Sequence, residues 1–168
     1  MSQQTRFQAE THISAMIFRD RIDIELPPEP IWEMLRYAEY MELWNPKCLH
    51  SPGLGRPLEL GDRFEATFKL TRESKSEVEV VEFEPMQRIV FRHQSEEIKG
   101  YAVESYALEA IRDGQTTRVK QQLDMRKLAF PIWVKPLIWL IALTGRKMDN
   151  NGPLAGLRET AIAQAGME

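Results

Sequence analysis

The chain has 168 residues, the length of one ordinary domain, with 43% apolar and 28% charged residues and a net charge of −3. This balance is typical of a globular protein, and the small negative charge argues against binding to nucleic acid or anionic lipid through overall charge. The single cysteine, Cys48, excludes an internal disulfide and fits a reducing compartment. Because the first residues lack the basic and apolar regions of a secretory signal, we expect a cytoplasmic protein. We expect one domain over residues 1–168, with residues 1–11 extended or disordered.

A strand followed by a broken helix is predicted at the start of the fold. Residues 12–26 alternate apolar and polar side chains, as a half-buried strand does. The sequence LPPEP ends this strand because proline cannot continue the ladder, and Pro30 suits the first turn of a helix. Apolar residues then recur at helical spacing. The helix is expected to break and resume before Trp44, where Asn45 and Pro46 stop it.

Five strand patterns and a helical region follow. The turn signals at Pro85-Met86 and Asp113-Gly114 predict sequential antiparallel strands. Residues 130–165 are predicted to be helical in two parts, separated by DNNGP, with Asn151 or Gly152 as the cap of the second part. The first part contains the most apolar stretch, FPIWVKPLIWLIALTG. It is shorter than the ~20 residues of a membrane span, so it indicates a buried helix rather than membrane contact.

Together these patterns predict an α+β fold. A curved antiparallel sheet of six to seven strands would wrap around a long C-terminal helix, with two short helices after the first strand. A curved sheet that grips one helix leaves space between them. Five segments carry a resemblance to a known family: IELPPEPIWEML, LWNP, GRPLELGDRF, DGQTTRV and GPLAGLRE. Together they are spread over nearly the whole chain.

In these segments the sequence resembles the START-like, or SRPBCC, superfamily, which has the helix-grip fold, and within it the polyketide cyclase/dehydrase-like proteins. The resemblance implies an internal cavity for a lipid, sterol, polyketide, quinone or similar hydrophobic compound. Some members are aromatases or cyclases. The superfamily carries no universal catalytic set, so the resemblance implies no particular catalytic residue.

Turn lengths predict which side chains face this cavity. A two-residue turn at Asp113-Gly114 pairs Leu108 with Val119, Tyr106 with Gln121 and Glu104 with Leu123, provided that no bulge intervenes. The turn at Pro85-Met86 likewise places Phe91 near Val80 and His93 near Val78. The predicted ligand-binding residues are Trp44, Phe64, Phe68, Val80, Phe91, His93, Glu104, Tyr106, Leu108, Val119, Gln121 and Leu137. Apolar walls with a few polar groups are typical of small-molecule pockets.

The polar groups on this face are open to more than one interpretation. His93, Glu104 and Tyr106 are candidate catalytic groups, but His93 and Tyr106 could equally be structural residues whose polar atoms find partners. Glu104 needs water, a ligand or a partner such as His93, and a register slip would instead pair it with Arg92 on the outer face. Gln121 could serve only a backbone group.

Two apolar features also have alternative interpretations. Trp44 could lie at the mouth of the cavity or anchor its helix against the sheet. The apolar helix around Trp133, Leu137 and Trp139 could gate the cavity or be a plain core helix. Cys48 has no adjacent base and is interpreted as a small apolar residue.

Cofactors and metals are not indicated. The sequence has no G-x-S-x-G, H-E-x-x-H or P-loop motif, and the three histidines lack the spacing of metal ligands. Basic residues form no stripe interleaved with aromatic residues, so no nucleic-acid partner is expected.

Three functions remain open. The first is a non-catalytic carrier or sensor of a hydrophobic small molecule. The second is a cyclase, dehydratase or similar lyase that acts on such a ligand in the same cavity, with His93 and Tyr106 as proton carriers. The third is an interaction module, in which the apolar C-terminal helix forms a homodimer or partner surface.

Overall fold

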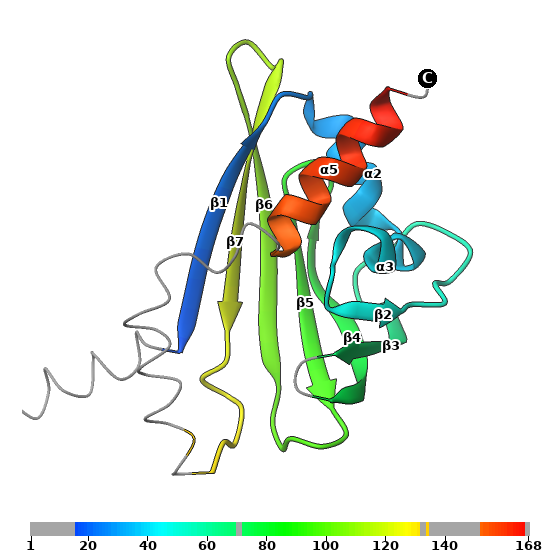
Figure 1. Cartoon of the computed structure of the whole chain (residues 1–168), viewed down its shortest axis with the longest axis vertical. Coiled ribbons are helices and arrows are strands. Elements are labelled where there is room, and N and C mark those ends of the chain that lie inside the picture. Colours follow the sequence, from blue (N-terminus) through cyan, green and yellow to red (C-terminus); the bar gives the residue numbers. More distant parts are fainter. Residues whose placement is uncertain (1–15, 70–71, 132–133, 135–151, 167–168) are drawn as a thin grey trace, which may run out of the picture.

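One curled antiparallel sheet and a set of helices on its inner face form the protein. The computed structural model describes residues 16–69, 72–131, 134 and 152–166. In these residues the sheet has seven strands in the order β1-β7-β6-β5-β4-β3-β2, and its helices lie on one side (Figure 1). The strands are β1 (Ile17–Ile24), β2 (Cys48–His50), β3 (Arg63–Lys69), β4 (Glu73–Glu84), β5 (Arg88–Ser95), β6 (Ala102–Ile111) and β7 (Thr116–Asp124). The helices are α2 (Pro28–Arg36), η1 (Ala38–Tyr40), α3 (Met41–Trp44) and α5 (Pro153–Ala165). The predicted α+β helix-grip fold is confirmed.

The helical segments after β1 begin and end where the sequence predicts. α2 has proline in its first turn, where a missing N–H costs no helix hydrogen bond, and it ends at Arg36. The chain resumes as η1 and α3, which stops at Asn45 with extended backbone. α5 starts at Pro153 with Gly152 as its N-cap. The first part of the predicted helical region, with Trp133, Leu137 and Trp139, lies outside the described residues.

β2 is the strand that the sequence does not predict. It has only three residues, and Leu49 and His50 within it are exposed. Its pairing with β3 includes an irregularity between Cys48 and His50. Such a short edge strand has no room for the alternation that identifies a strand.

The hairpin between β6 and β7 has the predicted register. Asp113 and Gly114 both have positive φ, at 57° and 81°, as the two central residues of a type I′ turn require. The pairing of Glu104 with Leu123, Tyr106 with Gln121 and Leu108 with Val119 follows from this turn, as predicted.

The β4–β5 hairpin reaches the predicted pairing by a different route. Glu84 pairs with Arg88 across a three-residue turn in which Met86 has a φ of 63°. The register then shifts between Val80 and Glu82, where the extra residue forms a bulge. The bulge compensates for the longer turn, so that Val80 still pairs with Phe91 and Val78 with His93.

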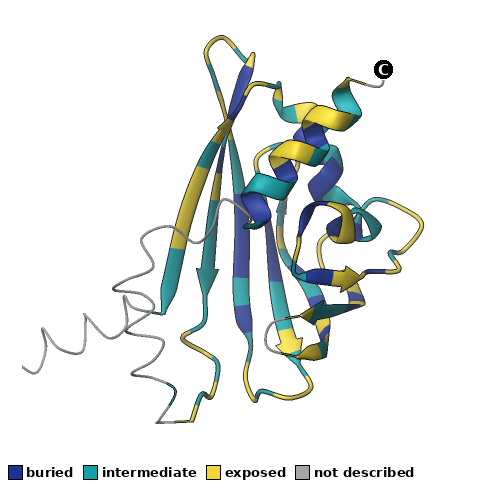
Figure 2. Ribbon diagram, in the orientation of Figure 1, coloured by how far each residue is buried: buried dark blue, intermediate teal, exposed yellow. Residues whose placement is uncertain are grey.

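The core lies between the sheet and the helices, and Figure 2 shows the buried positions concentrated there. α5 packs mainly against α3 and α2. It approaches α3 so closely that a side-chain carbon on Gly156 would lie 2.1 Å from the carbonyl oxygen of Trp44. This contact explains why the segment GPLAGLRE has a glycine at its centre.

Candidate functional site

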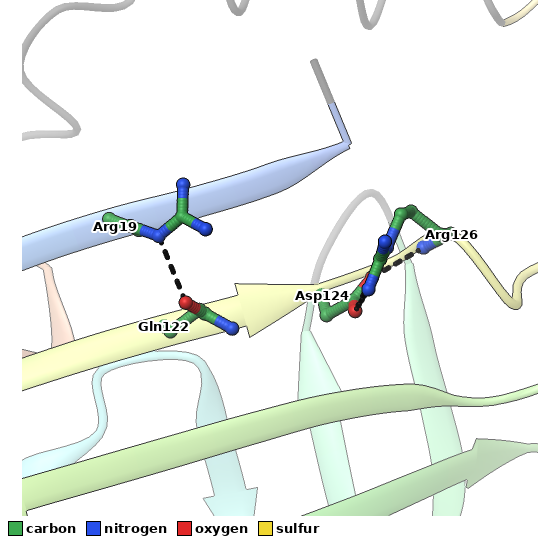
Figure 3. A network of polar contacts seen from close by, with 4 residues as sticks. All are labelled: Arg19, Gln122, Asp124 and Arg126. Atoms are coloured by element: carbon green, nitrogen blue, oxygen red, sulfur yellow. Dashed lines mark hydrogen bonds and ion pairs between the residues drawn. The ribbon is translucent and has the colours of Figure 1, made fainter. Parts of the chain in front are cut away.

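The register of the ladders divides the strand residues into two chemically different faces. The inner face carries the apolar residues that pack under the helices. Every lysine and arginine within the strands lies on the outer face, in positions that alternate with the inner ones: Arg19, Arg21, Arg63, Lys69, Lys75, Arg88, Arg92, Arg118 and Lys120. Several of these form outer-face hydrogen bonds, such as that from Arg19 Nε to Gln122 Oε1 at 2.9 Å (Figure 3).

Next to this bond, Figure 3 also shows Asp124 at the end of β7, whose carboxylate accepts hydrogen bonds from Arg126. Another pair of opposite charges lies farther along the outer face, where Arg118 donates hydrogen bonds to Asp23 from its Nε and one terminal nitrogen. The described cations of the strands therefore lie away from the interior, and several of them are paired on the outer face.

Under α3 and α5 the inner face is filled by the protein's own side chains. Phe91 and Tyr106 are 0% exposed and Trp44 is 1% exposed, so none of them borders a void that admits water. The rings of Trp44 and Tyr106 meet edge to face, as do those of Phe91 and Tyr106. Val80 and Val119 are also 0% exposed and Phe64 is 6% exposed. These six predicted ligand-binding residues therefore form core in this structure.

Trp44 is not at an open mouth. Its Nε1 donates a hydrogen bond of 2.9 Å to the backbone carbonyl oxygen of Met34, inside the protein. The bond ties α3 to α2, and the ring contact ties α3 to β6. Of the two positions that the sequence left open, these contacts support the anchor, because the polar end of the indole is satisfied by a buried carbonyl instead of water.

The inner face becomes partly exposed toward the β5–β6 connection. We call this part the lower zone, defined by Phe18, Phe68, His93, Gln121 and Leu123, all of which are neither fully buried nor fully exposed. The rings of Phe68 and His93 have centroids 5.5 Å apart, and Leu123 lies between Phe18 and Glu104 in the ladders. Phe18 and Leu123 were not among the predicted ligand-binding residues, although the predicted register already paired Leu123 with Glu104 on the inner face.

A buried polar network borders the lower zone. Glu104 Oε1 accepts hydrogen bonds from the Tyr106 hydroxyl at 2.7 Å and from Gln121 Nε2 at 2.5 Å. Gln121 Nε2 also lies 3.2 Å from the Tyr106 hydroxyl oxygen. The second oxygen of Glu104, Oε2, lies 3.3 Å from His93 Nε2. The structure therefore brings together all four polar groups that the sequence assigns to the inner face.

The network determines the charge of Glu104. Burial alone raises the pKa of its carboxyl group, but His93, Tyr106 and Gln121 outweigh burial and hold that pKa below its usual value. Burial and the neighbouring carboxylate raise the pKa of Tyr106 well above its usual value. Glu104 is thus an anion at neutral pH and Tyr106 is a neutral donor committed to it.

His93 Nε2 is the one buried side-chain atom of this network that has no hydrogen-bond partner among the described residues. Its Nε2 is buried and close enough to Glu104 for an ion pair, but no described residue gives it a well-aligned hydrogen bond. Its side chain keeps 14% of its surface exposed. The alternative pairing of Glu104 with Arg92 does not occur, because Arg92 binds Glu79 on the outer face.

Two further predicted ligand-binding residues, Leu108 and Leu137, do not contribute to the lower zone as defined. Leu108 is half-buried beside the core, and Leu137 lies outside the described residues. In the described part of the chain, no three histidine, cysteine, aspartate or glutamate side chains come together to hold a metal ion. No helix among the described residues is long and apolar enough to cross a membrane.

Comparison with solved structures places this geometry among known folds. Protein NE0264 from Nitrosomonas europaea superposes with a TM-score of 0.63 at 11% identity, over 92% of this chain and 99% of that one. A START superfamily protein from Mycobacterium smegmatis superposes with a TM-score of 0.56 at 17% identity, over 77% and 95% of the two chains. The chain has the START-like fold.

A further solved structure is larger than this chain. DynU16, a protein in the dynemicin biosynthetic locus, matches with a TM-score of 0.55 at 14% identity, over 86% of this chain and 46% of that one. This START-like chain therefore spans about half of DynU16. No protein-family model and no curated protein matches the sequence.

Proposed function

We propose that this START-like protein binds a hydrophobic small molecule, of the lipid, polyketide, isoprenoid or aromatic class, against the lower zone of its inner face. The observation that carries the proposal is the run of partly exposed apolar side chains beside a buried polar network. Phe18, Phe68 and Leu123 offer apolar contact, and His93 offers a polar atom without an aligned partner. Apolar walls with few polar groups are what such sites need.

The likeness to a START superfamily protein and to a protein of the dynemicin locus supports the binding of a ligand by this fold, without naming that ligand. Burial of apolar ligand surface would supply the driving force, at about 25 cal/mol per Å². The filled core under Trp44 and Tyr106 argues that the ligand lies farther down the sheet than the sequence alone suggests.

Fluorescence titration with Nile red, a neutral hydrophobic dye, tests the proposal. Leu123→Gln introduces an amide into the lower zone and is expected to weaken dye binding at least fivefold. Val103→Gln is the matched control, because Val103 is also half-buried but points to the outer face of the neighbouring strand. No dye binding by the wild type, or equal loss in both variants, would contradict a site in the lower zone.

A cyclase or dehydratase on the same surface is the second candidate, and the His93–Glu104 pair favours it. A histidine held 3.3 Å from a carboxylate could carry a proton to or from a bound ligand. Tyr106 fits a catalytic role less well, because its hydroxyl donates to Glu104. In an enzyme, His93→Ala would abolish turnover of an added polyketide while Nile red still binds. Persistence of turnover in that variant would rule out His93 as the proton carrier.

A homodimer through the apolar segment before α5 also stays a prediction, since that segment lies outside the described residues. Light scattering over a range of concentrations would separate a dimer from a monomer. A cytoplasmic location is likewise a prediction, testable by fractionation.

A further inference from the structure

The charges of the inner face suggest which ligands the proposed site accepts. On the strands of the described part of the chain, the inner-face positions hold no lysine or arginine, whereas the exposed Asp20 and the buried Glu104 both belong to this face. Asp20 pairs with Gln121 across β1 and β7, next to the network. Among the described inner-face residues of β1 and β3 to β7, His93 is the one side chain that can carry a positive charge, and Glu104 already lies beside it.

Glu104 cannot readily be displaced from this arrangement. Its Oε1 receives two hydrogen bonds, from Tyr106 and Gln121, and both donors are fixed on the two strands that pair at this point. A ligand carboxylate that approached His93 would bring a second anion close to Glu104. Because Glu104 is itself buried, a second carboxylate beside it would be repelled more strongly than in open water.

A neutral oxygen fits the same place. A hydroxyl can accept a hydrogen bond from His93 Nε2 and donate one to Glu104 Oε2, and a carbonyl oxygen can accept from a protonated His93. Either group would supply the aligned partner that Nε2 lacks, after a small movement of the ring that opens this buried atom. A buried polar atom without a partner is costly, so this contact adds to the apolar burial.

We propose that the lower zone selects neutral hydrophobic molecules that carry a hydroxyl or carbonyl oxygen, and that it discriminates against carboxylates of the same size. This inference rests on the proposed function, because it concerns the ligand of the same surface. We therefore expect long-chain alcohols, phenols and polyketide-like ketones to bind more tightly than fatty acids and aromatic acids.

Calorimetric titration of the wild-type protein with two matched pairs tests this inference. The pairs are 2-naphthol with 2-naphthoate, and 1-dodecanol with dodecanoate below its micelle concentration. At pH 7.5 the neutral member of each pair is expected to bind at least tenfold more tightly. Carboxylates that bind as tightly as their neutral partners would overturn the inference and leave the proposed function intact. Absence of binding by both members of both pairs, together with no Nile red binding, would overturn both.

Glu104→Gln tests the cause of the selection. The amide keeps the shape of the side chain and removes its charge, so the preference for 2-naphthol is expected to fall at least fivefold. Gln122→Glu, which adds a carboxylate to the outer face of β7, is the control and should leave the preference unchanged. Should Glu104→Gln prove unfolded by circular dichroism, His93→Gln provides the second test. This change removes the imidazole beside Glu104 and should weaken the binding of 2-naphthoate further. An unchanged preference in whichever of these two variants folds would contradict the electrostatic cause.

Discussion

Trp44 and Tyr106 meet edge to face at the centre of the molecule, with ring centroids 5.4 Å apart and planes at 80°. Trp44 ends α3 and Tyr106 lies in the middle of β6, so this contact joins the helical layer to the sheet. Tyr106 in turn donates to Glu104. The packed half of the inner face therefore holds one side of the polar network in place.

Trp44→Phe removes a buried hydrogen bond to Met34 and leaves a small void. We expect a loss of about 1–3 kcal/mol in the free energy of unfolding, measured by urea denaturation. Leu43→Ala is the control, because Leu43 is 59% exposed and its truncation should change stability by less than about 0.5 kcal/mol. Equal stability of the two variants would show that Trp44 does not anchor α3.

Gly156→Ala is expected to destabilise the protein, although alanine favours a helix by about 1 kcal/mol over glycine. The added carbon would lie 2.1 Å from the carbonyl oxygen of Trp44, so α5 would have to move away from α3. Thermal unfolding should show a lower midpoint. At Gly166 the nearest atom to an added carbon is 3.5 Å away, and Gly166→Ala should therefore leave the midpoint almost unchanged. A higher midpoint for Gly156→Ala would mean that α5 does not pack this closely.

Local sequence signals predicted the fold and its faces well. The Asp113-Gly114 dipeptide predicted the pairing of β6 and β7, because this pair of residues is typical of a two-residue hairpin turn. The four polar groups of the inner face could be placed together for that reason. The β4–β5 pairing was predicted correctly only because a longer turn and a bulge offset each other, and neither feature had a sequence signal.

The extent of the open surface could not be predicted from the same signals. Alternation shows which side chains face inward, but it does not show whether a helix fills the space in front of them. Phe91 and Val119 are covered by the protein, while Phe68 and Leu123 on the same face remain partly exposed. That difference depends on where α3 and α5 lie over the sheet, which is decided by long-range packing such as the close approach at Gly156.

Cys48 is expected to react slowly in the native protein. Burial raises the pKa of its thiol to about 11, with a smaller contribution from the charge of Glu42. At pH 8 the thiolate fraction should then be about a hundredfold smaller than for an unperturbed thiol. Ellman's reagent should react at least a hundredfold more slowly with the native protein than with the protein in urea. A rapid native reaction would contradict the buried position of Cys48 in β2.

Acid should weaken the protein in part through Glu104. Its pKa in the folded state is held below the usual 4.5, so the folded state favours the ionised form and the unfolded state binds the proton more readily. The resulting stability is present above pH 4.5 and is lost as the pH falls through the lower folded-state pKa. Asp23, Asp62, Glu109 and Asp124 also have lowered pKa values, so wild-type stability alone does not isolate Glu104.

The difference in unfolding free energy between the wild type and Glu104→Gln isolates this contribution. Urea denaturation at a series of pH values between about 3 and 5 should show the advantage of the wild type shrinking as the pH falls, since the surface carboxylates contribute equally to both proteins. Glu109→Gln, on the outer face of the same strand, provides a matched comparison for a carboxylate paired with an exposed lysine. A difference between wild type and Glu104→Gln that stays constant over this range, or grows as the pH falls, would show that Glu104 is not an ionised member of the buried network.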